Sequence, residues 1–110
     1  MDKKDKRKLG KEWNVILKAI GNETKRAIVA HIGRNGKTKG GNEAFVKPVI
    51  KLSSEYGVEL NPFSIPPKLS ELKHKDGLVA LDENGYWVLT ENGKKAYNLM
   101  VYLVKNGFDE

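Results

Sequence analysis

The residues best suited to binding chemistry lie together in residues 65–75, between a pair of prolines and a glycine. If this segment is a helix, its outward face and edges carry hydroxyl, carboxylate, imidazole and ammonium groups, from Ser70, Glu71, His74, Lys68, Lys73 and Lys75. Short polar side chains can exchange hydrogen bonds with a partner, and lysines can neutralise phosphate groups. The combination favours a polyanion-binding surface, although the same lysines also suit an ordinary solvated helix face.

Further residues join this candidate surface because of their chemistry and their place in the chain. Two lysines stand in a glycine-rich loop, one hydroxyl precedes residue 65, and two polar residues lie at the tip of a predicted hairpin: Lys37, Lys39, Ser64, Asn84 and Tyr86. The same tip holds Asp82 and Glu83. Because carboxylates repel phosphates, we expect the hairpin tip to orient the protein or to contact a partner, and not to insert deeply into a DNA groove.

The sequence lacks the patterns of catalytic and metal-binding sites. The chain has no cysteine and two histidines, His31 and His74, too few for a thiolate or histidine-carboxylate metal set. Gly36-Lys37-Thr38 resembles part of a phosphate-binding loop, but that motif needs four residues between its glycines, and only two separate Gly33 from Gly36. We therefore expect no enzyme, no metal and no cofactor.

The net charge is +6 and the isoelectric point is about 9.5, which favours a polyanionic partner. The charge is uneven: residues 1–11 and 34–75 are basic, whereas residues 82–110 are mildly acidic. We expect residues 1–8 to form a basic, flexible arm ahead of a single domain over residues 9–110.

Nothing in the sequence predicts a membrane segment. No run approaches about 18 apolar residues, and the N-terminal region is rich in lysine where a secretory signal would be apolar. The absence of cysteine fits a reducing compartment. We therefore expect a cytoplasmic protein.

Apolar residues at three- and four-residue steps predict three helices in the first half of the chain. The first covers residues 9–20, and Asn22 is a suitable N-cap for a second that ends within residues 33–36. Because proline is favourable in a first turn and costly inside a helix, we place the third helix at residues 48–56. Its αL cap is Gly57, and residues 42–47 stay unassigned.

The second half of the chain predicts a helix, a hairpin and a closing helix. Pro66 and Pro67 fit only a first turn, so a helix begins near Ile65 and runs to about Lys75. Strand-like residues around Asn84-Gly85 predict a hairpin over residues 78–89. Thr90 can then cap a last helix over residues 91–105. The predicted class is mainly α, with about five helices and one two-stranded hairpin.

Three segments carry a resemblance to a known family. Residues 16–32 (Ile-Leu-Lys-Ala-Ile-Gly-Asn-Glu-Thr-Lys-Arg-Ala-Ile-Val-Ala-His-Ile) are similar to the opening of ArsR-type regulators. Residues 69–79, with two spaced leucines followed by Asp-Gly-Leu-Val, resemble the end of that family's recognition helix and its first wing strand. Residues 86–96 (Tyr-Trp-Val-Leu-Thr-Glu-Asn-Gly-Lys-Lys-Ala) resemble the second wing strand and the start of the last helix.

The resemblance implies a winged helix-turn-helix that binds double-stranded DNA. Residues 65–75 would be its recognition helix in the major groove, and residues 78–89 would be its wing. Without cysteines the chain departs from the family's metal sensors. Residues 57–77 are also longer than the corresponding stretch in the family and contain Pro62 in addition to the paired prolines.

The apolar stripe of the last helix is wider than a small domain needs for its own core. We expect it to form a homodimer interface together with the first helix, through Leu9, Trp13, Leu99, Met100 and Leu103. Two-fold dimers match pseudo-palindromic DNA sites. Trp87, like Trp13, is expected to pack in or beside the core, and His31 is expected to be a packed histidine.

The leading hypothesis is therefore a sequence-specific, dimeric DNA-binding protein, most simply a transcriptional repressor. Two alternatives remain open: a plasmid or viral segregation adaptor that coats centromere repeats, and a winged-helix protein-interaction module with an unknown protein partner. A basic surface by itself also leaves RNA open as a partner.

Overall fold

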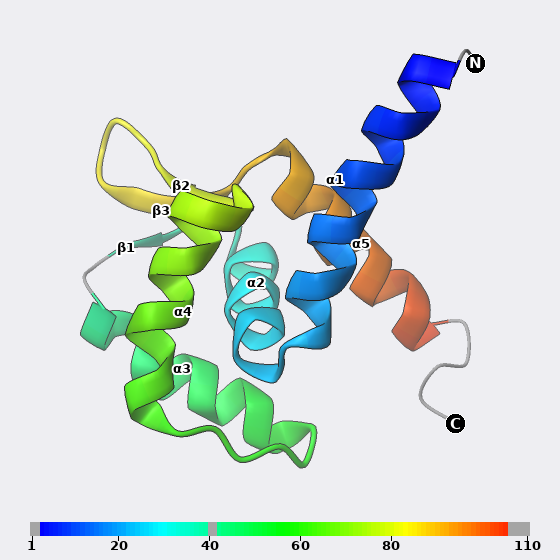
Figure 1. Cartoon of the computed structure of the whole chain (residues 1–110). Helices are drawn as coiled ribbons and strands as arrows, with labels where there is room; N and C mark the ends of the chain where they lie inside the picture. Colours follow the sequence, from blue (N-terminus) through cyan, green and yellow to red (C-terminus); the bar gives the residue numbers. More distant parts are fainter. Residues whose placement is uncertain (1–2, 40–41, 106–110) are drawn as a thin grey trace.

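The computed structural model describes residues 3–39 and 42–105, with the side chains of residues 10–39 and 45–105. Over these residues the chain forms five α-helices and a three-stranded antiparallel sheet (Figure 1). The elements follow in the order α1 (Lys3–Gly21), α2 (Glu23–Asn35), β1 (Thr38–Lys39), α3 (Asn42–Glu55), α4 (Ile65–Glu71), β2 (Val79–Leu81), β3 (Tyr86–Leu89) and α5 (Glu91–Lys105). The expected class, mainly α with a small β part, is confirmed at this level.

Helix α1 is longer than the sequence predicted. It begins at Lys3, so residues 3–8 continue the helix where we expected a flexible arm. The physical reason is local: lysine, arginine and leucine are good helix formers, and no glycine or proline precedes Gly10. The first two residues of the expected arm lie outside the described residues.

The predicted cap of α2 is confirmed. The Asn22 side-chain oxygen accepts a hydrogen bond from the Lys25 backbone amide at 3.0 Å, and Asn22 itself has extended backbone angles. Glu23 follows in the first turn, where its negative charge interacts favourably with the positive end of the helix dipole. The chain therefore turns sharply between α1 and α2.

The predicted start of α3 is wrong, because Pro48 lies inside the helix and not in its first turn. A proline in a helix interior costs about 3 kcal/mol relative to alanine. Phe45, in the turn before Pro48, is fully buried and packs edge-to-face against Trp87 at 5.8 Å. Burying such a ring contributes a comparable free energy, so packing extends the helix back to Asn42.

The connection from α3 to the hairpin contains short, non-α turns that the sequence did not predict. Gly57 has the expected left-handed conformation, with φ 77°. A 3₁₀ turn, η1 (Pro62–Ser64), then leads directly into α4, whose first turn holds the paired prolines as predicted. After Glu71 the helix widens into a π turn, η2 (Leu72–Asp76), which ends at the left-handed Gly77.

The hairpin is confirmed, and it carries a third strand that the sequence did not predict. Strand β3 lies in the middle, between β1 and β2. Thr38 pairs with Trp87, and Lys39 pairs with Tyr86. Strand β1 has only two residues, too few for a recognisable alternation of apolar and polar side chains. The hairpin turn uses Gly85 in a left-handed conformation, with φ 80°.

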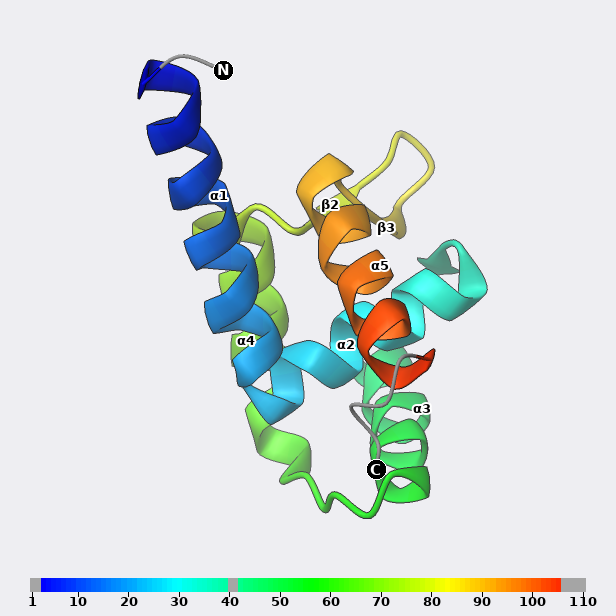
Figure 2. The ribbon, with the colours of Figure 1, turned by 90° about the vertical axis from the view of Figure 1, so that its right-hand side faces the viewer.

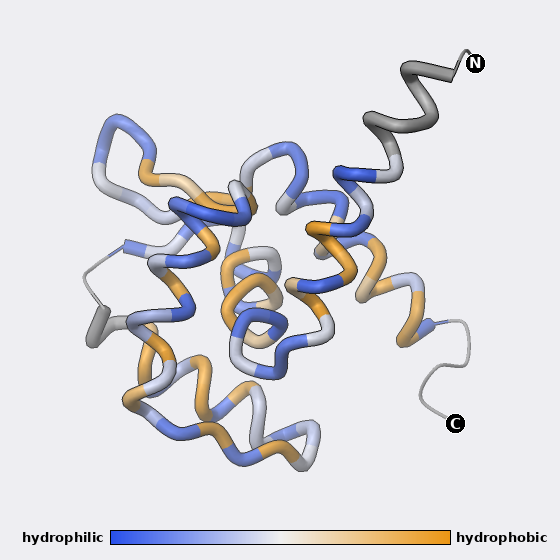
Figure 3. Tube along the Cα trace, in the orientation of Figure 1, coloured by the Kyte–Doolittle hydropathy of each residue, from blue (hydrophilic) through white to orange (hydrophobic). Residues whose placement is uncertain are grey.

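The core gathers around α2, which runs through the middle of the molecule (Figure 3). Its fully buried members include Ile28 and Ile32 of α2, Ile65 of α4, and Leu72 and Leu78 beside the hairpin. Trp87 is 9% exposed and Trp13 packs at the edge of the core, as expected. Within the described residues, no helix has the length and apolar character needed to cross a membrane.

The capping of α5 is also confirmed. The Thr90 hydroxyl accepts a hydrogen bond from the Gly93 amide at 3.1 Å and donates one to the Gly77 carbonyl at 2.6 Å. Gly93 lies directly against the Leu78 carbonyl, where a Cβ atom would collide with backbone. The start of α5 is therefore fixed tightly on the two residues that join η2 to β2.

Candidate nucleic-acid interface

The predicted surface residues lie on two separate parts of the molecule, the α4–η2 segment and the small sheet. In Figure 1, helix α4 and the β2–β3 hairpin lie to the left of α2, and α1 and α5 lie to its right. In the perpendicular view of Figure 2, α4 lies next to α1 and the hairpin lies next to α5. On the α4–η2 segment, Ser70, His74 and Lys75 are exposed, while Leu69 and Leu72 are buried. The outward side of this segment is therefore open to a partner.

Lys68 and Glu71 of α4 interact with each other. The Lys68 Nζ atom lies 3.1 Å from the Glu71 Oε2 atom, and this contact, followed by the influence of Lys25, holds the pKa of Glu71 below its usual value. The Glu71 carboxylate is 37% exposed and remains charged at neutral pH. Lys68 thus carries a partly compensated charge, and Glu71 is already engaged by lysines of its own chain.

A second pair of lysines shares one aromatic ring at the edge of the sheet. The Lys37 ammonium lies 4.4 Å from the centre of the Tyr86 ring, and that of Lys39 lies 5.7 Å from it. The pairing of β1 with β3 produces this cluster, because it sets Lys39 opposite Tyr86. Lys37, Lys39 and Tyr86 were all predicted as site residues. They come together only because β1 pairs with β3, and the sequence did not predict β1.

Lys73 connects the π turn to the same sheet. Its ammonium lies 5.8 Å from the centre of the Trp87 ring, which neighbours Tyr86 on β3. A cation over an aromatic face gains about 0.5–1 kcal/mol at exposed sites while its outer hydrogens remain available to a partner. Because consecutive residues of a strand face opposite sides of a sheet, Lys73 lies on the other face from Lys37 and Lys39. We call these three residues the sheet-edge lysines.

At the hairpin tip, the Asp82 side chain is bonded to backbone amides of the same turn. The Asp82 Oδ1 atom accepts hydrogen bonds from the backbone amides of Asn84 and Tyr86, each at 2.9 Å. Asn84 and Glu83 are exposed, and the tip is hydrophilic (Figure 3). The charge at Asp82 therefore helps to shape the turn, while the Glu83 carboxylate is exposed.

Ser64 has a structural role in addition to its predicted one. Its hydroxyl donates to the Asn61 carbonyl at 2.7 Å and lies 3.3 Å from the Thr24 hydroxyl oxygen. These bonds tie the start of α4 to α2. Beside it, Phe63 is 87% exposed, an aromatic side chain that the sequence reading did not single out.

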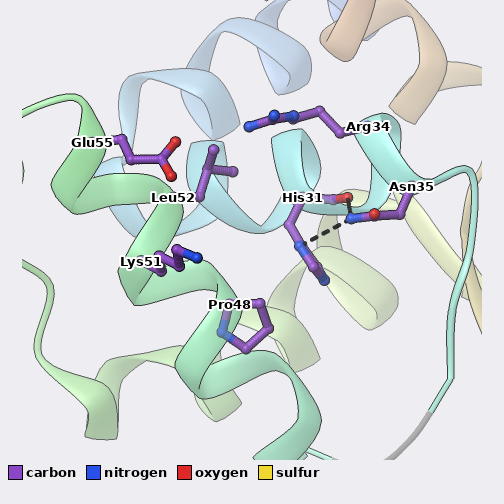
Figure 4. Close-up of a pocket in the computed structure, with 7 residues that line it drawn as sticks. All are labelled: His31, Arg34, Asn35, Pro48, Lys51, Leu52 and Glu55. Atoms are coloured by element: carbon purple, nitrogen blue, oxygen red, sulfur yellow. Dashed lines mark hydrogen bonds between the residues drawn. The ribbon is translucent and has the colours of Figure 1, made fainter.

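A polar pocket lies elsewhere, between α2 and α3 (Figure 4). It has a volume of about 320 Å³ and is lined by His31, Arg34, Asn35, Pro48, Lys51, Leu52 and Glu55. The His31 ring packs edge-to-face on Phe45 at 5.7 Å, which confirms the expected packed histidine. Burial, and then the nearby positive charge of Arg34, lower the pKa of His31.

The predicted dimer residues belong to the α1–α5 side. Trp13, Leu99 and Met100 are half-buried against the core, and Leu103 is also half-buried; the side chain of Leu9 lies outside the described residues. Four apolar residues of these helices outside the predicted dimer set are more exposed: Val15 (38%), Leu17 (52%), Tyr102 (61%) and Val104 (46%). Both helices therefore expose apolar side chains.

Comparison of the chain with protein-family models, with curated proteins and with solved structures finds no match. Within the part of the chain that the structure describes, no group of three or more histidine, aspartate and glutamate side chains is placed to hold a metal ion.

Proposed function

We propose that this protein binds double-stranded DNA as a winged helix-turn-helix of the ArsR-like type and acts as a transcriptional regulator, most simply a repressor. The observation that carries the proposal is the open outward side of α4 and η2, where Ser70, His74 and Lys75 are exposed. The α4–η2 segment enters the major groove, and the β2–β3 hairpin lies along the neighbouring backbone.

The physical basis is the fit between an α-helix and the major groove, the groove in which all four base pairs are distinguishable. Ser70 and His74 are exposed on the face that would meet base edges. Lysines at both margins of this face would neutralise phosphates and release counterions, which makes the affinity salt-dependent. The order α3, turn, α4, hairpin agrees with what the family resemblance implies.

Two copies of the chain bind together. The exposed apolar side chains of α1 and α5 supply a surface for a second copy, and in Figure 1 these helices lie on the other side of α2 from α4. A two-fold dimer would present two α4 segments, which suits half-sites about one helical turn apart. The arrangement explains why both helices expose apolar side chains.

The experiment that tests the proposal is selection from a random duplex library, followed by fluorescence anisotropy at several salt concentrations. The proposal predicts an enriched motif with two related halves. Ser70→Ala and His74→Ala should change the enriched bases, because these side chains face the groove. A library that emerges unenriched, with no salt-dependent binding to any duplex, would contradict the proposal.

A protein-interaction module is the second candidate, favoured by one observation. Phe63 is 87% exposed, at the leading end of α4, and is held there by the Asn61 side chain, which accepts a hydrogen bond from the Phe63 amide at 2.9 Å. Exposed aromatic side chains are enriched at protein interfaces. Charge reversal of Lys68 and Lys73 separates the candidates: unchanged nucleic-acid affinity would favour the protein partner.

A further inference from the structure

Lys25, in the first turn of α2, is nearly buried and makes ion pairs with the segment that carries the candidate interface. Its side chain is 12% exposed, and its Nζ atom lies 2.7 Å from the Asp76 Oδ2 atom. The same ammonium lies 3.5 Å from the Glu71 Oε2 atom. One lysine therefore joins α2 to the last residue of α4 and to the last residue of the π turn.

The π turn decides which way the basic residues after α4 point. It covers Leu72–Asp76, and both the Gly77 and Leu78 amides return to the Leu72 carbonyl. A π turn holds more residues per turn than an α-helix. The side chains of residues 73–75 therefore leave the axis in directions that a continued α-helix would not give them.

Asp76 is the point at which this turn is attached to the rest of the protein. Its side chain is 11% exposed, so its negative charge needs a close partner, and Lys25 provides it with a hydrogen bond of 2.7 Å. An ion pair with both partners largely removed from water has a defined geometry, whereas exposed pairs are weak and variable. Lys25 is thus suited to hold the turn in one conformation.

We propose that Lys25 is a positioning residue for DNA binding: through Asp76 and Glu71 it fixes the π turn, and so the directions in which Lys73, His74 and Lys75 face the duplex. The inference rests on the proposed function. Lys25 itself does not touch DNA, because its side chain is 12% exposed and its ammonium is occupied by two carboxylates. Its removal should therefore weaken binding only through the changed directions of Lys73, His74 and Lys75.

The test compares variants by fluorescence anisotropy on one selected duplex over a range of salt concentrations. Lys25→Met should lower the affinity about tenfold and also lower the salt slope, because Lys73 and Lys75 no longer point at phosphates. Lys25→Arg, which can keep both ion pairs, should restore most of the affinity. Lys18→Met, an exposed lysine of α1, is the matched control and should bind like the original chain.

A double variant separates positioning from general stability. Lys25→Met with Asp76→Leu removes both charges, and such replacements of buried pairs are often neutral for stability. We expect thermal unfolding close to that of the original chain and DNA binding still weakened about tenfold. A double variant that folds and binds with the original affinity would overturn the inference.

The inference is also testable without DNA, so that its failure and the failure of DNA binding are distinguishable. The Gly77 and Leu78 amides donate to Leu72 and report on closure of the π turn. Hydrogen exchange of these two amides should become faster in the double variant, while the amides of α2 stay protected. Unchanged exchange at Gly77 and Leu78 would show that Lys25 does not hold the turn, whether or not the protein binds DNA.

Discussion

The lysines of the candidate surface are not equivalent, because their neighbours differ. Lys68 lies 3.1 Å from the Glu71 carboxylate, so part of its charge is already compensated. Lys37 and Lys73 instead lie over the rings of Tyr86 and Trp87, which attract the ammonium without neutralising it. The sheet-edge lysines should therefore contribute more to phosphate binding than the lysine of α4.

This difference predicts the salt dependence of binding. Lys37→Ala and Lys73→Ala should each weaken binding to all duplexes and lower the slope of log affinity against log salt by about one unit. Lys68→Ala should have a smaller effect on the slope. Anisotropy titrations across a salt series check this, with Lys18→Ala as the control; equal slopes for all four variants would contradict it.

A second prediction concerns His31, whose pKa is lowered first by burial and then by Arg34. Its charged form is disfavoured in the fold, so His31 stabilises the protein above its usual pKa of 6.5, and this contribution is lost as the pH falls toward the lowered value. Lys51 and Glu55 also line its pocket. Denaturant unfolding at pH 7.5 and pH 5.5 should show a loss of stability that His31→Gln reduces. An identical loss in the variant would contradict the assignment.

At the scale of elements, most helices were predictable because their ends are local. Asn22 and Thr90 cap α2 and α5 with their own side chains, and the paired prolines specify the first turn of α4. Each of these signals lies within a few residues of the boundary that it sets. Sequence alone was therefore sufficient for these elements.

The elements that were missed depend on contacts distant in sequence. β1 exists because Thr38 and Lys39 pair with β3, and α3 extends past Pro48 because Phe45 packs against Trp87. The π turn is attached to α2 through the ion pair of Lys25 and Asp76, two residues that are separated in sequence by β1, α3 and α4. For the same reason the individual site residues were predicted, but the clusters that they form on β3 and around Glu71 were not.

The packing of α5 on the hairpin connection leads to a prediction about stability. Gly93→Ala places a methyl group against the Leu78 carbonyl, which must move, and the cost of such overpacking is about 1–3 kcal/mol. Gly10→Ala is the control: no atom lies within 4 Å of a Cβ there, so alanine should stabilise α1 by about 0.5–1 kcal/mol. Thermal unfolding of the two variants should shift in opposite directions, and a neutral Gly93→Ala would contradict the close contact.

At the scale of the whole molecule, the two sides have different chemistry. In the view of Figure 1, α4 and the hairpin lie on one side of α2, and α1 and α5, with apolar residues such as Leu17 and Tyr102 exposed, lie on the other. A molecule divided in this way can bind a polyanion on one side while a second copy covers the other. In the proposed function, DNA binding and dimerisation therefore use different sides of the molecule.

The assembly has its own test, by analytical ultracentrifugation. At micromolar concentration the protein should sediment at about twice its 12.3 kDa chain mass. Leu17→Glu should shift it toward the monomer, because a charge would enter the apolar interface, while the exposed neighbour Lys18→Glu should not. Sedimentation of the original chain as a monomer would contradict the dimer.

The most direct test of DNA binding uses the absence of cysteine from the chain. Ser70→Cys introduces a single thiol on the outward side of α4, to which an iron chelate that cleaves DNA can be attached. If α4 lies in the major groove, the bound conjugate should cut the duplex inside the selected site, and the same chelate on Lys18→Cys should not. A Ser70→Cys conjugate that binds the site and leaves it intact would contradict the placement of α4 against DNA.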